Sequence, residues 1–135
     1  MKVVIDSNVL ISALIKESTT RKLIVESDLE FYYPEISLHE IRKHRNLVIE
    51  KSGIGEQEYA KMLNVLLSRI TLVPEEHIQQ KLEEAANILN KIDPDDVVFL
   101  ATALSMPDSV IWSNDKDFER QDKVKGLKTK EMIKV

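Results

Sequence analysis

The chain has 135 residues, a formal net charge of −4 and no cysteine. This length predicts a single domain, residues 1–135, because folding at this size buries roughly two-thirds of the surface of the unfolded chain. Without cysteine there is no disulfide framework and no thiolate zinc site, which favours a reducing cytoplasm. The first apolar run is too short for a signal peptide, and none reaches the roughly 18 residues of a membrane-spanning helix, so no membrane association is expected.

Short apolar runs rich in β-branched and aromatic residues alternate with helical patterns along the chain. The runs that predict strands are residues 2–5, 30–33, 70–73, 109–112 and 127–129. The helical segments between them indicate parallel pairing, because parallel strands need long crossover connections. The sequence therefore predicts a three-layer α/β/α fold around a mostly parallel sheet of about four to five strands.

Three segments carry the strongest helical patterns. Residues 59–70 and 78–89 each place apolar side chains three and four positions apart, which predicts one stripe facing the core. The segment DDVVFLATAL, residues 95–104, is apolar nearly all round, as is typical of a helix buried on several sides. Any part of the 59–70 stripe left exposed would suit an interface with another protein.

Acidic residues follow strands or begin helices at four separate places. Asp6 directly follows the first strand, and Asp115 follows the strand predicted at 109–112. Glu40 and the group Asp93, Asp95 and Asp96 lie at the starts of predicted helices. In an open parallel α/β sheet, strand carboxyl ends and the following helix N-termini share the edge where ligands bind, so these acids are expected to meet.

Helix capping is the competing interpretation of each acid taken singly, because Asp, Ser and Asn are the usual N-cap residues. The segment SLHE, residues 37–40, fits a capping box with Ser37 as the N-cap. The segment DPDD fits Asp93 as an N-cap followed by Pro94 in the first helical position. Asp6 and Asp115 are equally suited to cap the helices that follow them.

The convergence of the acids favours a metal site. Two carboxylates about 4 Å apart repel by roughly 4 kcal/mol at an effective dielectric constant of about 20, so several together need a counter-charge. An all-oxygen ligand set selects Mg²⁺ or Mn²⁺. Zinc is not expected, because His39 and His44 lie five positions apart, about 140° round a helix, and the histidines are poor candidates for ligands.

The same stretches resemble the PIN domain ribonucleases, whose commonest small members are VapC-type toxins of toxin–antitoxin pairs. VVIDSNVLISAL, ISLHEI, DDVVFLATAL and VIWSNDKDF are similar to the four motifs of that family, in order and across essentially the whole chain. The resemblance implies that the metal ligands are Asp6, Glu40, Asp96 and Asp115. Ser113 stands where the family more often has Thr, and Asp117 belongs to the Asp-Phe pair that follows.

The acids and the resemblance together predict an endoribonuclease that hydrolyses RNA with Mg²⁺ or Mn²⁺. Ser113 is expected to hydrogen-bond a carboxylate or a water beside the metal. The expected accessory residues are Asn8, Asp93 and Asp117. Because the acids repel the RNA backbone, nearby cations are also needed, and the candidates are Arg42, Lys43, Arg45 and Lys116. The resemblance further implies a homodimer and an antitoxin partner.

Two other functions stay open at the level of sequence. A PIN-like module could bind RNA or protein without cutting. A phosphatase of the haloacid-dehalogenase type also has an Asp after its first strand, but it requires a second Asp two residues later, where this chain has Asn8. The sequence contains no GxSxG elbow, P-loop or GxGxxG motif, which argues against triad hydrolases and nucleotide-binding enzymes.

Overall fold

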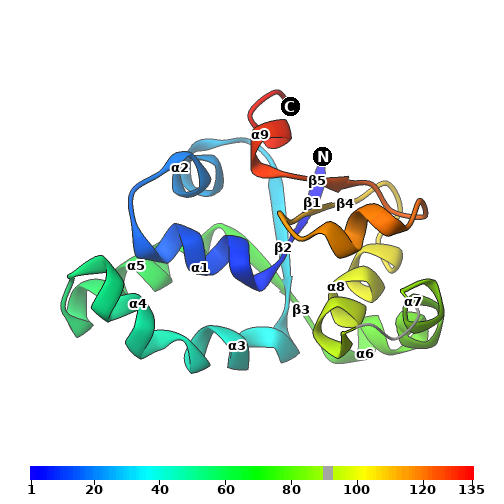
Figure 1. The fold of residues 1–135 in the computed structure, drawn as a ribbon, viewed down its shortest axis with the longest axis horizontal. Helices are drawn as coiled ribbons and strands as arrows, with labels where there is room; N and C mark the ends of the chain where they lie inside the picture. The colour runs from blue at the N-terminus through cyan, green and yellow to red at the C-terminus, as the bar shows by residue number, and fades with distance from the viewer. Residues whose placement is uncertain (90–92) are drawn as a thin grey trace.

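A computed structural model describes residues 1–89 and 93–135 of the chain (Figure 1). Its five strands form one sheet in which every neighbouring pair is parallel, in the order β3-β2-β1-β4-β5. The strands are β1 (Lys2–Ile5), β2 (Glu30–Pro34), β3 (Ile70–Val73), β4 (Val110–Trp112) and β5 (Gly126–Leu127). The prediction of a mostly parallel sheet of about four to five strands is confirmed, and the predicted strand ends are correct to within two residues.

Helices cover both faces of the sheet, which confirms the three-layer arrangement (Figure 1). On one side lie α1 (Ser7–Ile15), α2 (Thr19–Glu26), α4 (Arg45–Ser52) and α5 (Glu56–Ser68). On the other side lie α6 (Glu75–Ile78), α7 (Leu82–Ile88) and α8 (Pro94–Leu104). The short helices α3 (Leu38–Lys43) and α9 (Thr129–Met132) follow β2 and β5.

The core lies against both faces of β1. Val3, Val4 and Ile5 are all 0% exposed, as expected for the central strand of a parallel sheet, where a continuous apolar run replaces alternation. Helix α8 contacts β1, β2 and β4, and most of the residues of α8 are buried. The prediction that residues 95–104 form a helix buried on several sides is therefore confirmed.

The helix predicted over residues 78–89 needs correction. The structure divides this region into α6, a 3₁₀ turn at η2 (Gln79–Lys81) and α7. All three segments contact α8, so the bend at η2 allows both α6 and α7 to pack against that helix. No helix-breaking residue marks the turn, and tertiary packing therefore decides where the helix bends.

The capping box predicted at residues 37–40 is wrong. Ser37 does occupy the N-cap position of α3, but its side chain makes no capping hydrogen bond. A 3₁₀ turn, η1 (Glu35–Ser37), precedes α3 and leaves Ser37 at φ −88° and ψ 0°. A capping side chain needs an extended backbone at that position, so the geometry does not permit the bond.

The chain adds strands on both sides of β1, with β2 and β3 on one side and β4 and β5 on the other. The carboxyl ends of β1 and β4 thus meet where the connections diverge, which is the usual ligand position in such sheets. Among the residues that the structure describes, no helix is long and apolar enough to cross a membrane.

Candidate metal centre

An acidic pocket of about 210 Å³ opens at the edge of the sheet where β1 and β4 end. Its lining residues are Asp6, Ser7, Asn8, Glu40, Asp93, Asp95, Asp96, Phe99 and Asp115. No Lys or Arg is among the described residues that line it. The four separated acidic stretches therefore do converge on one place, and no basic side chain in the lining neutralises them.

Asp6 is both a helix cap and a pocket residue. Its Oδ1 accepts a hydrogen bond from the backbone N–H of Val9 at 2.8 Å, which caps α1. Its Oδ2 accepts a hydrogen bond from the Ser113 hydroxyl. Burial raises the pKa of Asp6 above its ordinary value, although the hydrogen bonds from Ser113 and Val9 partly offset this rise. Capping and participation in the site are thus compatible, because the two oxygens serve different partners.

Ser113 links the ends of β1 and β4. Its hydroxyl donates to Asp6 and accepts from the backbone N–H of Asp115 at 3.0 Å. The side chain is 3% exposed, so water does not compete for these bonds. The expected contact between Ser113 and a carboxylate is therefore present. Ser113 connects Asp6 to the backbone of Asp115.

Asp96 lies in the first turn of α8, after the N-cap Asp93 and Pro94 at the first helical position, as predicted. It is 8% exposed, and its Oδ2 is buried without a hydrogen-bond partner among the described residues. Burial, together with Asp117 and Asp115, raises the pKa of Asp96 to about 8. The carboxylate is therefore costly to ionise as long as no cation is bound.

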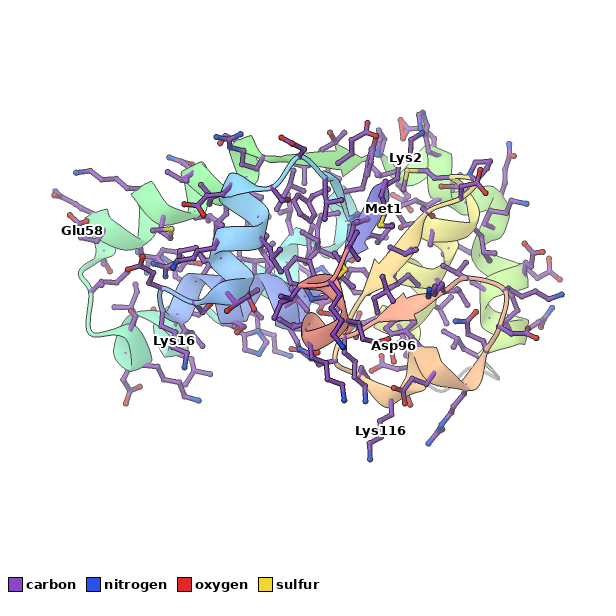
Figure 2. All side chains as sticks on the ribbon, turned by 90° about the horizontal axis from the view of Figure 1, so that it is seen from above. Met1, Lys2, Lys16, Glu58, Asp96 and Lys116 are labelled. Atoms are coloured by element: carbon purple, nitrogen blue, oxygen red, sulfur yellow. The ribbon has the colours of Figure 1, made fainter. Side chains whose placement is uncertain are left out.

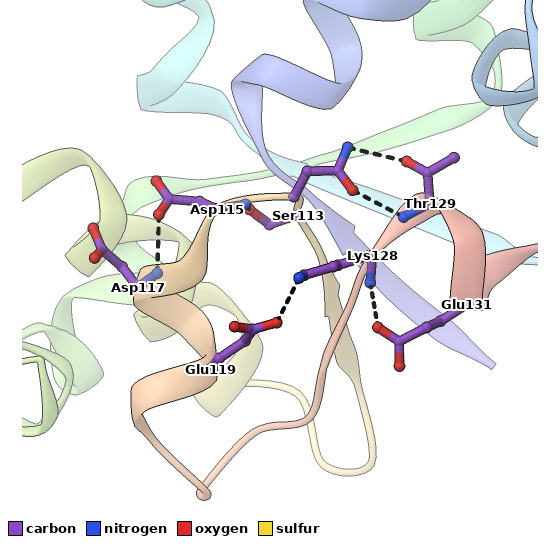
Figure 3. Close-up of polar contacts among 8 residues, drawn as sticks. Ser113, Asp115, Asp117, Glu119, Lys128, Thr129 and Glu131 are labelled. Atoms are coloured by element: carbon purple, nitrogen blue, oxygen red, sulfur yellow. Dashed lines mark hydrogen bonds and ion pairs between the residues drawn. The ribbon is translucent and has the colours of Figure 1, made fainter.

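Asp115 and Asp117 follow β4, and Asp115 lines the pocket. Asp115 caps the 3₁₀ helix η3 (Lys116–Arg120) by accepting from the backbone N–H of Asp117 at 2.9 Å (Figure 3). Asp96, Asp115 and Asp117 each offer an oxygen within 4.8 Å of the others. Asp117 also lies 3.7 Å from the guanidinium of the exposed Arg120. This first cluster consists of carboxylates alone.

Glu40 approaches the pocket from α3. Its Oε1 is buried and has no hydrogen-bond partner among the described residues, and burial raises its pKa. The turn that carries Glu40 is held by Tyr33, whose hydroxyl donates to the carbonyl of Ser37 at 2.9 Å. The Ser7 hydroxyl lies 2.6 Å from the Tyr33 hydroxyl. A buried network from α1 and β2 thus positions a carboxylate on a separate helix.

The sequence analysis missed His39. One ring nitrogen of His39 lies within 4.8 Å of carboxylate oxygens of Glu40 and Asp95, which forms a second cluster in which nitrogen is present. His39 has no histidine four positions away on its helix, and its position directly before Glu40 is the signal in the sequence. His44 does lie outside this cluster, with its Nδ1 2.8 Å from the backbone oxygen of Glu40.

The basic residues expected to contact RNA differ in their surroundings. Arg42 and Lys43 are exposed on α3, and Lys116 projects from the edge of the molecule (Figure 2). Arg45 instead lies 3.3 Å from Glu56 and 5.7 Å from the centre of the Tyr59 ring. Arg45 is therefore already engaged with α5, while the other three side chains are open to solvent.

The fold and the pocket together define a PIN-like α/β protein with an acidic centre at the topological switch point. The sequence profile described as PIN domain matches residues 4–135. The chain belongs to the PIN domain family, which confirms the resemblance carried by the four motifs and sets aside the haloacid-dehalogenase alternative. No curated protein sequence matches the chain.

Solved structures share the fold at low sequence identity. One is the VapBC2 complex from Rickettsia felis bound to a DNA fragment from its promoter, with a TM-score of 0.72 and 15% identity over 95% of this chain and 98% of that chain. Another is FitAB bound to an IR36 DNA fragment, with a TM-score of 0.65 and 20% identity over 94% of each chain. At these identities the likeness establishes the architecture alone.

Proposed function

We propose that this PIN domain protein is an endoribonuclease that hydrolyses RNA phosphodiester bonds with Mg²⁺ or Mn²⁺. The observation that carries the proposal is the pair of buried carboxylate oxygens, Glu40 Oε1 and Asp96 Oδ2, that have no hydrogen-bond partner among the described residues. A buried carboxylate without a partner costs several kcal/mol when ionised. A divalent cation in the pocket would remove that cost at both residues.

The ligands present fit a hard divalent cation. Asp6, Glu40, Asp96 and Asp115 would hold it, because carboxylate oxygens are the ligands that Mg²⁺ and Mn²⁺ prefer. The accessory residues in this proposal are Asn8, Asp93 and Asp117. When bound in such a site, the ion lowers the pKa of water and neutralises charge on a phosphodiester.

The protein's own side chains prepare this centre. Ser113 holds Asp6 and Asp115 together, and the Tyr33 hydroxyl fixes the turn that leads to Glu40. Preorganised ligands of this kind avoid the cost of ordering when substrate arrives. Around the pocket, Arg42, Lys43, Arg45 and Lys116 are proposed to contact the RNA backbone, with Arg45 first leaving Glu56.

The test is cleavage of a structured RNA by the purified chain with Mn²⁺, Mg²⁺ or EDTA. Asp96→Asn and Asp6→Asn are expected to reduce metal-dependent cleavage by at least about a hundredfold. Asparagine at position 6 keeps an oxygen that can accept from Val9, so the cap of α1 survives. The matched control is Asp122→Asn, which removes an exposed carboxylate outside the pocket and should leave cleavage unchanged.

Two outcomes would contradict the proposal. Cleavage that persists in EDTA would show that the acidic pocket is not the source of the activity. No cleavage with either ion, together with no metal binding by calorimetry, would favour a PIN module that binds RNA or protein without cutting.

We also propose that the protein forms a homodimer in the cytoplasm and binds an antitoxin partner, and the VapBC2 and FitAB complexes support the antitoxin partner. On α5, Tyr59 and Leu66 are buried in the core, while Val65 is 44% exposed and is available for an interface. Light scattering at micromolar concentration should give the mass of a dimer. A monomer under these conditions would contradict the dimer and leave the nuclease proposal intact.

A further inference from the structure

Two consecutive residues of α8, Asp95 and Asp96, belong to different clusters. Successive side chains of a helix are about 100° apart, so neighbours leave the axis in different directions. Asp96 meets Asp115 and Asp117, whereas Asp95 meets His39 and Glu40. The acids at this edge of the sheet therefore fall into an all-carboxylate cluster and a cluster that contains an imidazole.

The imidazole of His39 is prepared to act as a ligand. Its Nδ1 lies 2.8 Å from the carbonyl oxygen of Ile36. A carbonyl can only accept, so Nδ1 carries the proton and Nε2 keeps a free lone pair. Metal-binding histidines are typically oriented by such a bond from the other ring nitrogen.

Glu40 supplies the inner side of this second cluster. Its Oε1 is buried without a partner among the described residues, while His39 and Asp95 are exposed and leave the cluster open to solvent. Asp96 shows the same deficiency in the neighbouring part of the pocket, since it is 8% exposed and its Oδ2 is also unpaired. Each cluster thus contains one buried oxygen that lacks a positive partner.

We propose that His39, Glu40 and Asp95 form a second cation subsite that selects a transition-metal ion, with Mn²⁺ as the probe, over Mg²⁺. The reason is ligand chemistry: an imidazole nitrogen suits transition metals, whereas Mg²⁺ prefers oxygen ligands and its own waters. The first subsite keeps Asp6, Asp96 and Asp115 of the proposed ligand set, with Asp117 beside them, and offers oxygen alone, so it lacks this means of discrimination. Glu40 of that set would hold the second ion. This inference rests on the metal binding in the proposed function and extends it to a second ion.

The experiment measures Mn²⁺ binding to the full chain by equilibrium dialysis and by pulsed electron paramagnetic resonance. The wild-type protein should bind two Mn²⁺ ions, and one should show magnetic coupling to ¹⁴N of an imidazole. His39→Asn should lose that coupling and should bind the second Mn²⁺ ion at least about tenfold more weakly. Binding of the first Mn²⁺ ion should not change. The asparagine amide can still donate to Ile36, which preserves the local turn.

The matched control is His77→Ala, which removes an exposed histidine of α6 outside both clusters. It should keep two Mn²⁺ ions and the nitrogen coupling. When Mg²⁺ is added to the wild-type protein, it should first displace the Mn²⁺ ion that shows no nitrogen coupling.

Three results would overturn the second subsite. They are a single Mn²⁺ ion without nitrogen coupling, coupling that persists in His39→Asn, and coupling that disappears in His77→Ala. If RNA cleavage still requires metal in any of these cases, the nuclease proposal stands while the second subsite falls. If no ion binds at all, both fall.

Discussion

Asp6 and Asp96 are buried to almost the same extent, at 5% and 8% exposed, but their carboxylates differ in hydrogen bonding. Both oxygens of Asp6 accept hydrogen bonds, from Val9 and from Ser113. The Oδ2 of Asp96 has no partner among the described residues, and Asp115 and Asp117 lie close by. Burial alone therefore does not identify the place where a cation is needed; the state of the hydrogen bonds does.

We infer from this comparison that Asp6 and Asp96 have different roles at the edge of the sheet. The β1–α1 junction around Asp6 is complete within the protein and can serve as a rigid frame. The first turn of α8 around Asp96 is incomplete, and a ligand would complete it. Variants that act differently at the two positions can test this difference in roles.

The largest expected effect is stabilisation by metal. At roughly a thousand times its dissociation constant, an ion that binds only the folded state adds roughly 4 kcal/mol to the free energy of unfolding. Thermal unfolding of the wild-type protein should move to higher temperature with Mn²⁺ and return with EDTA. Asp96→Asn should raise the unfolding temperature in EDTA, because it removes a buried carboxyl group that must either take up a proton or carry an unpaired charge. It should also lose most of the response to Mn²⁺.

Asp6→Asn is the contrasting variant in the same experiment. It should raise the unfolding temperature in EDTA less than Asp96→Asn does, because the hydrogen bonds from Val9 and Ser113 partly offset the cost of burying the Asp6 charge. Equal stabilisation by both substitutions would contradict the difference in roles between the two positions.

The next effect is the loss of the Ser113 hydroxyl. Ser113→Ala should lower the free energy of unfolding by about 1–3 kcal/mol, because it leaves Asp6 Oδ2 and the Asp115 N–H short of a partner. Urea unfolding measures the change. Ser12→Ala, at an exposed position of α1, is the control and should change stability little. A Ser113 variant as stable as this control would show that the frame around Asp6 does not depend on the serine.

The pH dependence of stability tests the state of Asp96 in another way. Burial and the neighbouring acids raise the pKa of Asp96 to about 8 in the folded protein from an ordinary value of 3.8. Between these values the folded state holds a proton that the unfolded state has lost, so stability falls as the pH rises. The slope from this one group is at most about 1.4 kcal/mol per pH unit.

Urea unfolding in EDTA across this pH range should therefore show declining stability for the wild-type protein and a shallower decline for Asp96→Asn. Saturating Mn²⁺ should flatten the wild-type profile in the same way. An unchanged slope in Asp96→Asn would assign the pH dependence to other groups.

The smallest effect concerns the cap of α1. Asp6→Ala should be less stable than Asp6→Asn by about 1 kcal/mol, because alanine cannot accept from the backbone N–H of Val9. Chemical unfolding of the two variants measures the difference. Equal stability would mean that the capping bond contributes nothing, and that Asp6 serves the pocket alone.

Much of the fold could be predicted from local patterns. The β-branched runs at residues 2–5 and 70–73 became strands with the predicted ends, and the apolar segment 95–104 became the buried helix α8. Helices α2 and α4 were missed because each is only eight residues long, too short for a sustained apolar stripe. The interrupted helix at 78–89 was missed because packing on α8, rather than a helix breaker, produces the bend.

For the candidate site, the sequence predicted which acidic residues meet better than it predicted how they are arranged. Acids that follow strands must reach one edge of a parallel sheet, so the meeting of Asp6, Asp96 and Asp115 followed from order along the chain. The proximity of His39 to Asp95 was not predicted, because it depends on how α3 and α8 lie relative to each other. The ion pair between Arg45 and Glu56 likewise joins two helices, α4 and α5, whose relative position local patterns do not predict.

The amino-acid sequence by itself determined the alternation of strands and helices, the parallel sheet and the set of acids at its carboxyl edge. These follow from residue periodicity and from the short-range rules of chain connection, which need no knowledge of distant neighbours. Only the tertiary structure decided which carboxylate oxygens are satisfied and how the acids divide into two clusters. The physical reason is distance along the chain: Ser113 is 107 positions from the Asp6 that it stabilises, and only folding brings such partners together.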